Sequence, residues 1–135
     1  MSEVKTNKLT GVTTAGSILV TAEGNSTTTN LQQALAKAWS LLDGTGTIAL
    51  SDSFNIGSTT DHGTGDYTLT VSNAFGSANF SCTANGRQDE SPGWTAMTSS
   101  VGATAATTVR ITSRNTSNTA TDQEQLHSQL MGDLA

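Results

Sequence analysis

The chain has 135 residues, enough for one compact domain and a short additional segment but not for two full domains. Hydrophobic residues make up 34% of it, charged residues 13%, and the formal net charge is −5. The acidic balance and the scattered Lys and Arg argue against a nucleic-acid-binding protein, and a single cysteine excludes an internal disulfide framework. This polar, weakly charged composition with one proline is typical of an all-β protein rather than of a disordered chain.

Membrane insertion and secretion are not indicated. No stretch approaches the ~18 consecutive apolar residues of a membrane-spanning helix. The first twelve residues lack the basic start and the apolar run of a signal peptide. We therefore expect synthesis in the cytoplasm and no insertion into a membrane.

Residues 1–29 predict an extended N-terminal arm. They contain two short β-prone runs, 3–6 and 17–21, followed by the segment 25–29, which has no apolar side chain. Such a segment buries too little surface to fold alone, so we expect either a flexible arm or a segment that a partner orders. The candidate anchoring residues are the apolar ones of this arm: Val4, Leu9, Val12, Ile18, Leu19 and Val20.

A short amphipathic helix is expected within residues 30–43. Asn30 is a favourable N-cap, Gln33 completes a capping-box pattern, and Gly44 supplies a C-terminal stop. Apolar residues recur at the three- and four-residue spacing of one helical face. That stripe either packs on the domain's own sheet or forms an oligomer interface at a symmetry axis, and it comprises Leu31, Ala34, Leu35, Ala38, Trp39 and Leu42.

Residues 44–135 predict an antiparallel β-sandwich head. Alternating apolar and polar runs, such as 67–71 and 107–112, are separated by turn clusters such as 59–65. The segment 122–131 is ambiguous. Its Gln, Glu and Leu content favours a helix, whereas the alternation within it is typical of a strand.

The sequence contains no arrangement of residues that indicates catalysis. The two histidines are far apart in the sequence, and no nucleophile elbow, phosphate-binding loop or spaced carboxylate pair occurs. We therefore expect no enzymatic activity, no metal and no cofactor. Residues 57–65, 86–95 and 113–121 are expected to form outward-facing polar loops, with His62, Arg87 and Trp94 as candidate outward contacts. Trp94 could stack on a sugar or anchor a protein, or it could close the end of the sandwich.

Several motifs resemble a domain that recurs in tail-fibre-like and other virion structural proteins of marine tailed bacteriophages. They are Leu31-Gln32-Gln33-Ala34-Leu35-Ala36-Lys37-Ala38-Trp39, Asp43-Gly44-Thr45-Gly46-Thr47-Ile48-Ala49, Asp52-Ser53-Phe54-Asn55-Ile56 and Asp61-His62-Gly63-Thr64-Gly65-Asp66-Tyr67. The start Ser2-Glu3-Val4-Lys5-Thr6-Asn7-Lys8-Leu9 is similar as well, and the turn before Tyr67 is the most specific part. Family members end in an alternating strand followed by Gly-Asp, which Gly132-Asp133 matches, so the resemblance favours a strand over 122–131. Ser40-Leu41-Leu42 and the final Leu134-Ala135 depart from the family pattern.

This resemblance implies a non-enzymatic virion structural protein on the outside of the phage particle. Residues 1–25 would attach a homotrimer to another virion protein, and the head would face outward to contact a host-surface glycan or protein. The alternative is a capsid decoration or head-fibre protein bound to the shell through the same arm. A third class, an enzyme or a free binding module, has the least support from the sequence.

Overall fold

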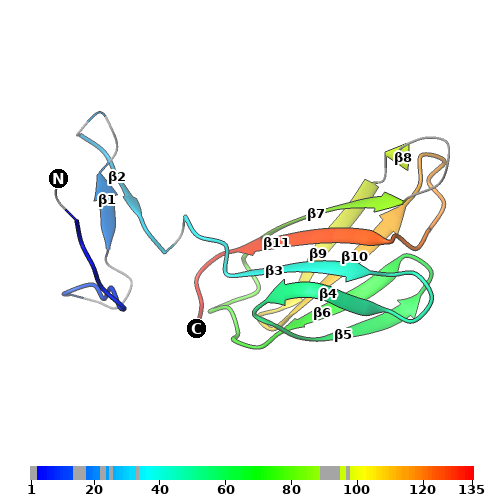
Figure 1. The fold of residues 1–135 in the computed structure, drawn as a ribbon, viewed down its shortest axis with the longest axis horizontal. Helices are drawn as coiled ribbons and strands as arrows, with labels where there is room; N and C mark the ends of the chain where they lie inside the picture. Colours follow the sequence, from blue (N-terminus) through cyan, green and yellow to red (C-terminus); the bar gives the residue numbers. More distant parts are fainter. Residues whose placement is uncertain are drawn as a thin grey trace. The chain divides into compact units, whose positions relative to one another are not determined.

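The computed structural model describes residues 3–13, 18–21, 24, 26–32, 34–88, 95–96 and 98–135. Its described part consists of strands, turns and irregular segments, and the sheets are antiparallel, which confirms the expected all-β class (Figure 1). The chain divides into two compact units, Met1–Leu35, which we call the arm, and Ala36–Ala135, which we call the head. Within the described ranges there is no helix long and apolar enough to cross a membrane.

The arm contains one small sheet. Strand β1 (Leu19–Thr21) pairs antiparallel with β2 (Thr28–Asn30), and the Leu31 N–H donates to the Ile18 carbonyl at 2.9 Å. Five of the six candidate anchoring residues are exposed on this unit, whereas Ile18 is half-buried. The arm therefore has no apolar core of its own among the described residues. The exposed five are Val4, Leu9, Val12, Leu19 and Val20.

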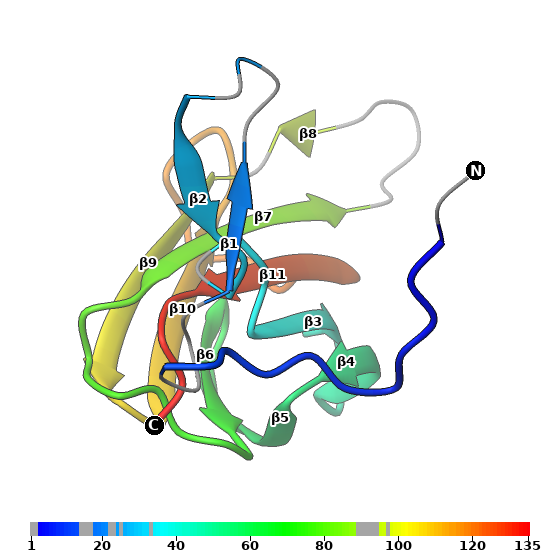
Figure 2. The same ribbon diagram turned by 90° about the vertical axis from the view of Figure 1, so that its left-hand side faces the viewer.

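Two antiparallel sheets form the head (Figures 1 and 2). The five-stranded sheet has the order β4 (Ala49–Phe54), β3 (Ala38–Asp43), β11 (Gln125–Met131), β7 (Ser81–Gln88) and β8 (Thr95–Ala96). The four-stranded sheet has the order β5 (Ile56–Gly63), β6 (Asp66–Val71), β10 (Thr108–Arg114) and β9 (Thr98–Ala105).

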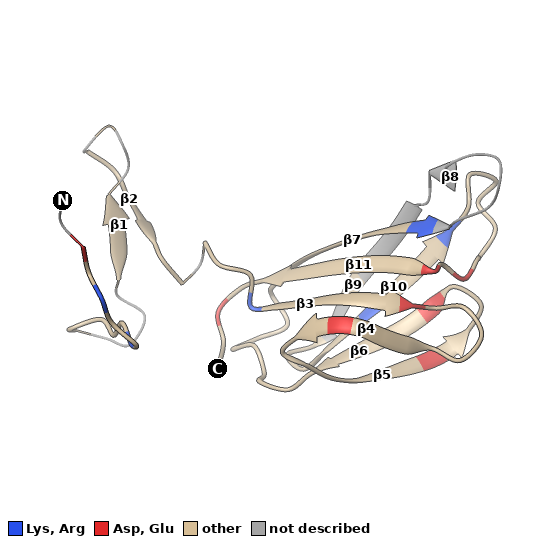
Figure 3. Ribbon diagram, viewed as in Figure 1, with Lys and Arg blue, Asp and Glu red and all other residues tan. Residues whose placement is uncertain are grey.

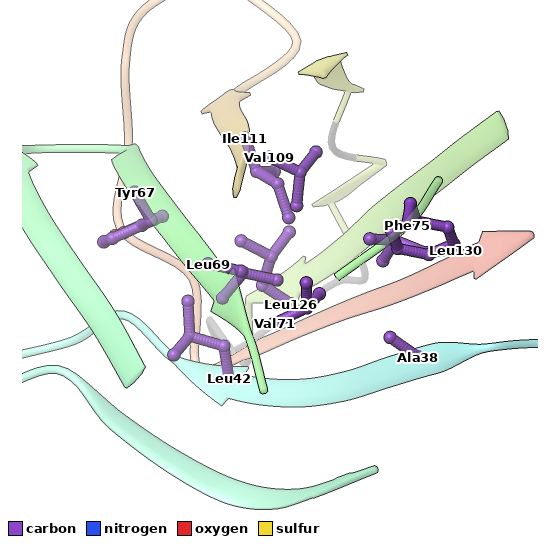
Figure 4. Packing of buried hydrophobic residues seen from close by; sticks show 10 residues of the cluster. All are labelled: Ala38, Leu42, Tyr67, Leu69, Val71, Phe75, Val109, Ile111, Leu126 and Leu130. Carbon is purple, nitrogen blue, oxygen red and sulfur yellow. The ribbon is translucent and has the colours of Figure 1, made fainter. Parts of the chain in front are cut away.

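The core lies between these two sheets, as in the expected β-sandwich. Every second residue of β6 and β10 is buried, and these side chains pack against those of β3 and β11 (Figure 4). Phe75 is a buried member of the core and stacks on the partly buried Phe80, with 4.2 Å between the ring centroids. The buried hydrophobic residues are Ala38, Leu42, Tyr67, Leu69, Val71, Phe75, Val109, Ile111, Leu126 and Leu130.

The expected helix within 30–43 is wrong. The Asn30 side chain does accept a hydrogen bond from the Gln32 N–H at 2.9 Å, as an N-cap would, but only a turn follows. Residues 38–43 instead form β3, which pairs with β4 on one side and β11 on the other. A helix of ~12 residues is marginal alone. Two hydrogen-bonded ladders and the burial of alternate residues therefore outweigh the local helical pattern.

The segment 122–131 is a strand over most of its length, as the family resemblance favours. Gln125–Met131 form β11, in which Leu126, Ser128 and Leu130 are buried and the residues between them are exposed. Strand β11 lies between β3 and β7, so both of its edges are paired. Position in the sheet thus overrides the helical propensity of Gln, Glu and Leu.

The Gly-Thr-Gly-Asp-Tyr turn joins β5 to β6 and is held by a hydrogen-bonded cluster that we call the clasp: Gly44, Gly65, Tyr67 and Asp122. The Gly65 N–H donates to Asp122 Oδ1 at 2.7 Å, and the Tyr67 hydroxyl donates to the same oxygen at 2.6 Å. Tyr67 is fully buried, and its hydroxyl lies 3.2 Å from the Gly44 carbonyl oxygen. Burial is the main cause and the hydrogen bond to Asp122 the second cause that raise the pKa of Tyr67 well above its usual range. The turn that carries the most specific part of the resemblance is therefore a structural connection in the head.

Asp66 of the same turn forms an ion pair with Arg110, and we expect this pair to make stability depend on pH. Arg110 Nε and Nη2 donate to the two Asp66 carboxylate oxygens at 2.7 and 2.5 Å. These hydrogen bonds lower the pKa of Asp66 below its ordinary value of 3.8. A carboxyl group whose pKa is lower in the folded state than in the unfolded state stabilises the fold at pH values above its unfolded-state pKa. This stabilisation is lost as the pH falls through the folded-state pKa.

The prediction is that Asp66→Asn reduces the drop in Tm measured between about pH 5 and about pH 2. Arg110→Gln should reduce it as well, and the double variant should add little to either single change, because both remove one pair. Parallel Tm profiles for the wild type and Asp66→Asn would contradict this assignment.

Candidate functional site

The outer face of the five-stranded sheet gathers aromatic and polar side chains. Residues alternate between the two faces of a strand, so each buried residue of β3 and β11 is followed by an outward one. Trp39 and Leu41 therefore lie on the face opposite to Leu42, and His127 and Gln129 lie on the same outer face. Strands β7 and β4 contribute Thr83, Asn85, Asp52 and Phe54 at matching positions.

Strand register places these side chains in two rows across the sheet. Directly opposed residues of antiparallel strands have Cβ atoms ~5 Å apart, so each row is a line of neighbouring side chains. The first row is Phe54, Trp39, Gln129 and Thr83. The second row is Asp52, Leu41, His127 and Asn85.

The two rows line a depression of about 570 Å³, which we call the outer groove. All of their residues contribute to its lining except Phe54, which is the cross-strand neighbour of Trp39. Ser40 and Ser128 also contribute, and their hydroxyls hydrogen bond to each other at 2.7 Å. This hydrogen bond joins β3 and β11 beneath the rows, which fixes the relative position of the two central strands.

Exposed aromatic residues single out this face of the head. In its described part the exposed large hydrophobic residues are Trp39, Phe54 and Leu134, with 37%, 53% and 43% of their surface exposed. The first two are partners in adjacent strands. The outer face of the four-stranded sheet carries threonines and the Asp66–Arg110 pair instead. Neighbouring exposed aromatics are a feature of binding surfaces.

Charge is sparse across the outer groove. Asp52 is the single Asp, Glu, Lys or Arg among its lining residues. Figure 3 shows that β3, β7 and β11 are largely free of charged residues except toward their ends. At those ends, Arg87 Nη1 donates to Gln125 Oε1 at 3.4 Å, and Asp43 accepts hydrogen bonds from Thr45, which lower the pKa of Asp43.

The two titratable side chains of the outer groove, Asp52 and His127, lie on strands that are not adjacent. Asp52 and His127 share a row but are separated by Leu41, which places them two strand spacings, or ~10 Å, apart. No three His, Cys, Asp or Glu side chains in the described ranges are grouped closely enough to hold a metal ion. Burial raises the pKa of the nearby Cys82 thiol to about 11, so it is a weak nucleophile at neutral pH.

The structure does not place the six expected oligomer-interface residues on one helical face. Leu31, Ala34 and Leu35 belong to the arm. Ala38 and Leu42 are fully buried in the core of the head. Trp39 alone of the stripe lies on the outer face of the head, where it lines the outer groove.

The candidate outward contacts do not form one site. His62 is exposed on β5 of the four-stranded sheet, where its Nε2 lies 2.9 Å from Thr68 Oγ1. Arg87 is on β7 of the other sheet, and Trp94 is outside the described residues. Sequence reasoning missed the groove residues Asn85, His127 and Gln129. The alternation of 125–131 places His127 and Gln129 on one face of a strand. It does not reveal that this strand lies between β3 and β7, which is what brings the two residues into the groove.

Searches of protein-family models, of curated protein sequences and of solved structures found no match to this chain.

Proposed function

We propose that this chain is a non-enzymatic structural protein of a bacteriophage particle, a tail-fibre-like appendage. In this proposal the arm anchors the protein to the particle, and the head faces outward to contact the host surface. The observation that carries the proposal is the pairing of a compact head with an arm whose apolar residues are exposed. The resemblance of the sequence to virion structural proteins of marine tailed phages supports it as well.

The arm is the anchoring part in this proposal because its exposed apolar side chains need a covering partner. Contiguous exposed apolar groups cost free energy in water and mark surfaces that bind other proteins. Leu9 and Val12 lie in a strand-free stretch of the arm, and Leu19 and Val20 lie on β1. Another virion protein, further copies of this chain, or both would cover these residues.

Antibody labelling of purified particles tests the proposal directly. An antibody raised against the full chain should label the tail of the encoding phage in electron micrographs. Labelling of many sites over the shell would instead favour the capsid decoration or head-fibre alternative, which would use the same arm. Unlabelled particles that also lack the peptide by mass spectrometry would contradict both.

The role of the arm can be tested with matched variants of the full chain. Leu9→Asp combined with Val12→Asp should abolish binding to particles that lack the protein. Asn7→Asp combined with Thr10→Asp adds the same charge at exposed polar positions and should leave binding intact. Equal loss in both variants would show that charge, not the removal of apolar surface, is responsible.

We further propose that the chain assembles as a homotrimer. Its small apolar complement and the exposed apolar side chains of the arm favour burial of further surface between copies. Light scattering on a sizing column should give a mass near three times 13.9 kDa. A monomeric mass would exclude the trimer and would leave the particle as the partner that covers the arm.

A further inference from the structure

We infer that the outer groove binds an uncharged saccharide. This inference rests on the proposed function, because it names the class of host-surface molecule that the head would contact. Three properties of the described residues point to that class: the size and openness of the groove, an exposed indole on its wall, and a lining of uncharged hydrogen-bonding groups.

The size of the groove suits a small ligand. Its volume of about 570 Å³ lies inside the range of ~300–1,000 Å³ found for small-molecule sites. It is formed on the outer surface of four adjacent strands rather than inside the core. A sugar that is part of a longer chain could therefore enter sideways.

Trp39 provides an apolar platform in the outer groove. Its side chain is 37% exposed, and its neighbours in the row are Phe54 on one side and Gln129 on the other. The flat, apolar indole can pack against the C–H face of a sugar ring while its N–H remains able to donate a hydrogen bond. The backbone of Trp39 is paired on both sides, so no ordering of the main chain is needed when a ligand binds.

The polar lining matches the hydroxyl groups of a sugar. Gln129 and Asn85 each offer an amide that both donates and accepts, Thr83 offers a hydroxyl, and His127 offers ring nitrogens. A sugar hydroxyl also donates and accepts, so such groups can pair with it in either direction. Gln129 and Thr83 lie in the same row as Trp39, and His127 and Asn85 lie in the second row. A ligand that spans several strands could therefore contact them together with Trp39.

Charge favours an uncharged saccharide over an acidic one. Asp52 is the one acidic residue in the lining, and no Lys or Arg lines the groove. A sulfate or carboxylate there would meet Asp52 without a compensating lysine or arginine. Asp52 could instead accept hydrogen bonds from neutral hydroxyls.

A protein partner is less well matched to this face. A stable protein interface usually covers ~800 Å² on each partner and has a largely apolar centre. Here two exposed aromatics adjoin a lining that interleaves apolar side chains with two amides, three hydroxyls, an imidazole and a carboxylate. A second copy or another protein on this face is an outcome that the following test would reveal.

The test is a binding titration with the full chain. The chain has two tryptophans, so the Trp94→Phe variant reports on Trp39 alone through its fluorescence. The probes are neutral oligosaccharides of glucose, galactose and N-acetylglucosamine, and sulfated and uronic-acid-containing oligosaccharides of similar length. We expect saturable changes in fluorescence with at least one neutral probe and weaker binding of the acidic ones.

Variants assign binding to the outer groove. Trp39→Ala should weaken binding about tenfold or more, and Asn85→Ala or Gln129→Ala about threefold to tenfold. Thr70→Ala, on the opposite sheet, should remain within about twofold of the wild type. Urea unfolding of each variant verifies that the head is still folded.

Three results would overturn the inference: no binding of any neutral probe, equal affinity of the wild type and a folded Trp39→Ala variant, or a lower oligomeric mass for that variant. The last result would identify the face as a contact between copies. Failure of the proposed function is distinguishable, because the chain would then be absent from particles whether or not it binds saccharide.

Discussion

Gly65→Ala should destabilise the head by about 2–5 kcal/mol, the sum of two separate costs. Gly65 has a φ of +66°, a left-handed conformation that an L-residue adopts at a cost of ~1–2 kcal/mol. A Cβ at this position would also lie 2.5 Å from the Ser113 carbonyl oxygen and 2.8 Å from the Thr121 nitrogen. Those atoms belong to the backbone and cannot rotate away, so overpacking adds ~1–3 kcal/mol. Thermal unfolding should show a Tm lower by roughly 8 °C or more.

Gly46→Ala is the matched control for this prediction. Gly46 has a similar φ of +59°, but nothing lies within 4 Å of a Cβ built there. Its substitution should therefore cost only the ~1–2 kcal/mol of the left-handed conformation. The difference between the two variants measures the close approach of Gly65 to Ser113 and Thr121. Equal losses would mean that the backbone around Gly65 moves freely to accommodate the methyl group.

Asp122→Ala should cost about 2–4 kcal/mol, because it removes the shared acceptor of two donors. The Gly65 N–H and the hydroxyl of the fully buried Tyr67 both donate to Asp122 Oδ1. Hydrogen bonds to a charged group contribute ~1.5–3 kcal/mol, and a donor left buried without a partner adds a desolvation cost. Urea unfolding should show a lower midpoint with an unchanged m value.

Tyr67→Phe and Asp122→Asn separate the contributions to the clasp. Tyr67→Phe removes one donor and should cost ~1–2 kcal/mol, whereas Asp122→Asn retains an acceptor oxygen and loses the charge. The Tyr67→Phe/Asp122→Ala double variant should be less destabilised than the sum of the single changes, because the phenyl ring leaves no orphaned hydroxyl. Additive effects would show that the two residues act independently, contrary to the 2.6 Å hydrogen bond between them.

The parts of the fold that follow from local patterns could be predicted from the sequence. The alternation in 67–71 and 107–112 corresponds to β6 and β10, whose buried residues form half of the core. The polar loop expected over 57–65 is wrong for most of its length, because residues 57–63 belong to β5 and pair with β6. Only residues 64–65 form the turn, where the positive φ of Gly65 favours glycine. Composition alone was enough to indicate the all-β class.

The failure at residues 30–43 has a specific physical origin. Ala38 and Leu42 are four residues apart, which fits one face of a helix, and they are an even number apart, which fits one face of a strand. The decisive fact is that β4 and β11 flank β3, and β11 lies more than eighty residues further along the chain. No local pattern contains that pairing.

The outer groove could not be predicted for the same reason. Trp39, His127 and Asn85 become neighbours only when β3, β11 and β7 align in register. A shift of one residue in any of these strands would turn its groove residues into the core. The site is thus a product of the register of the sheet, which the residue types alone do not reveal.

Residues 36 and 37 connect the arm to β3, so in the proposed function a load on the arm would enter the head through this strand. Lys37, at the junction, donates its N–H to the Leu130 carbonyl at 2.9 Å, and β3 pairs with β4 and β11 along both edges. Tension on an anchored arm would therefore be shared by two ladders of hydrogen bonds. An edge strand would instead transmit the same force to one ladder, whose bonds could break in succession. When the head is held by the arm and pulled by fluid drag, the force would act on β3, which is paired along both edges. We therefore expect the head to resist forced unfolding better than it would with the arm attached to an edge strand.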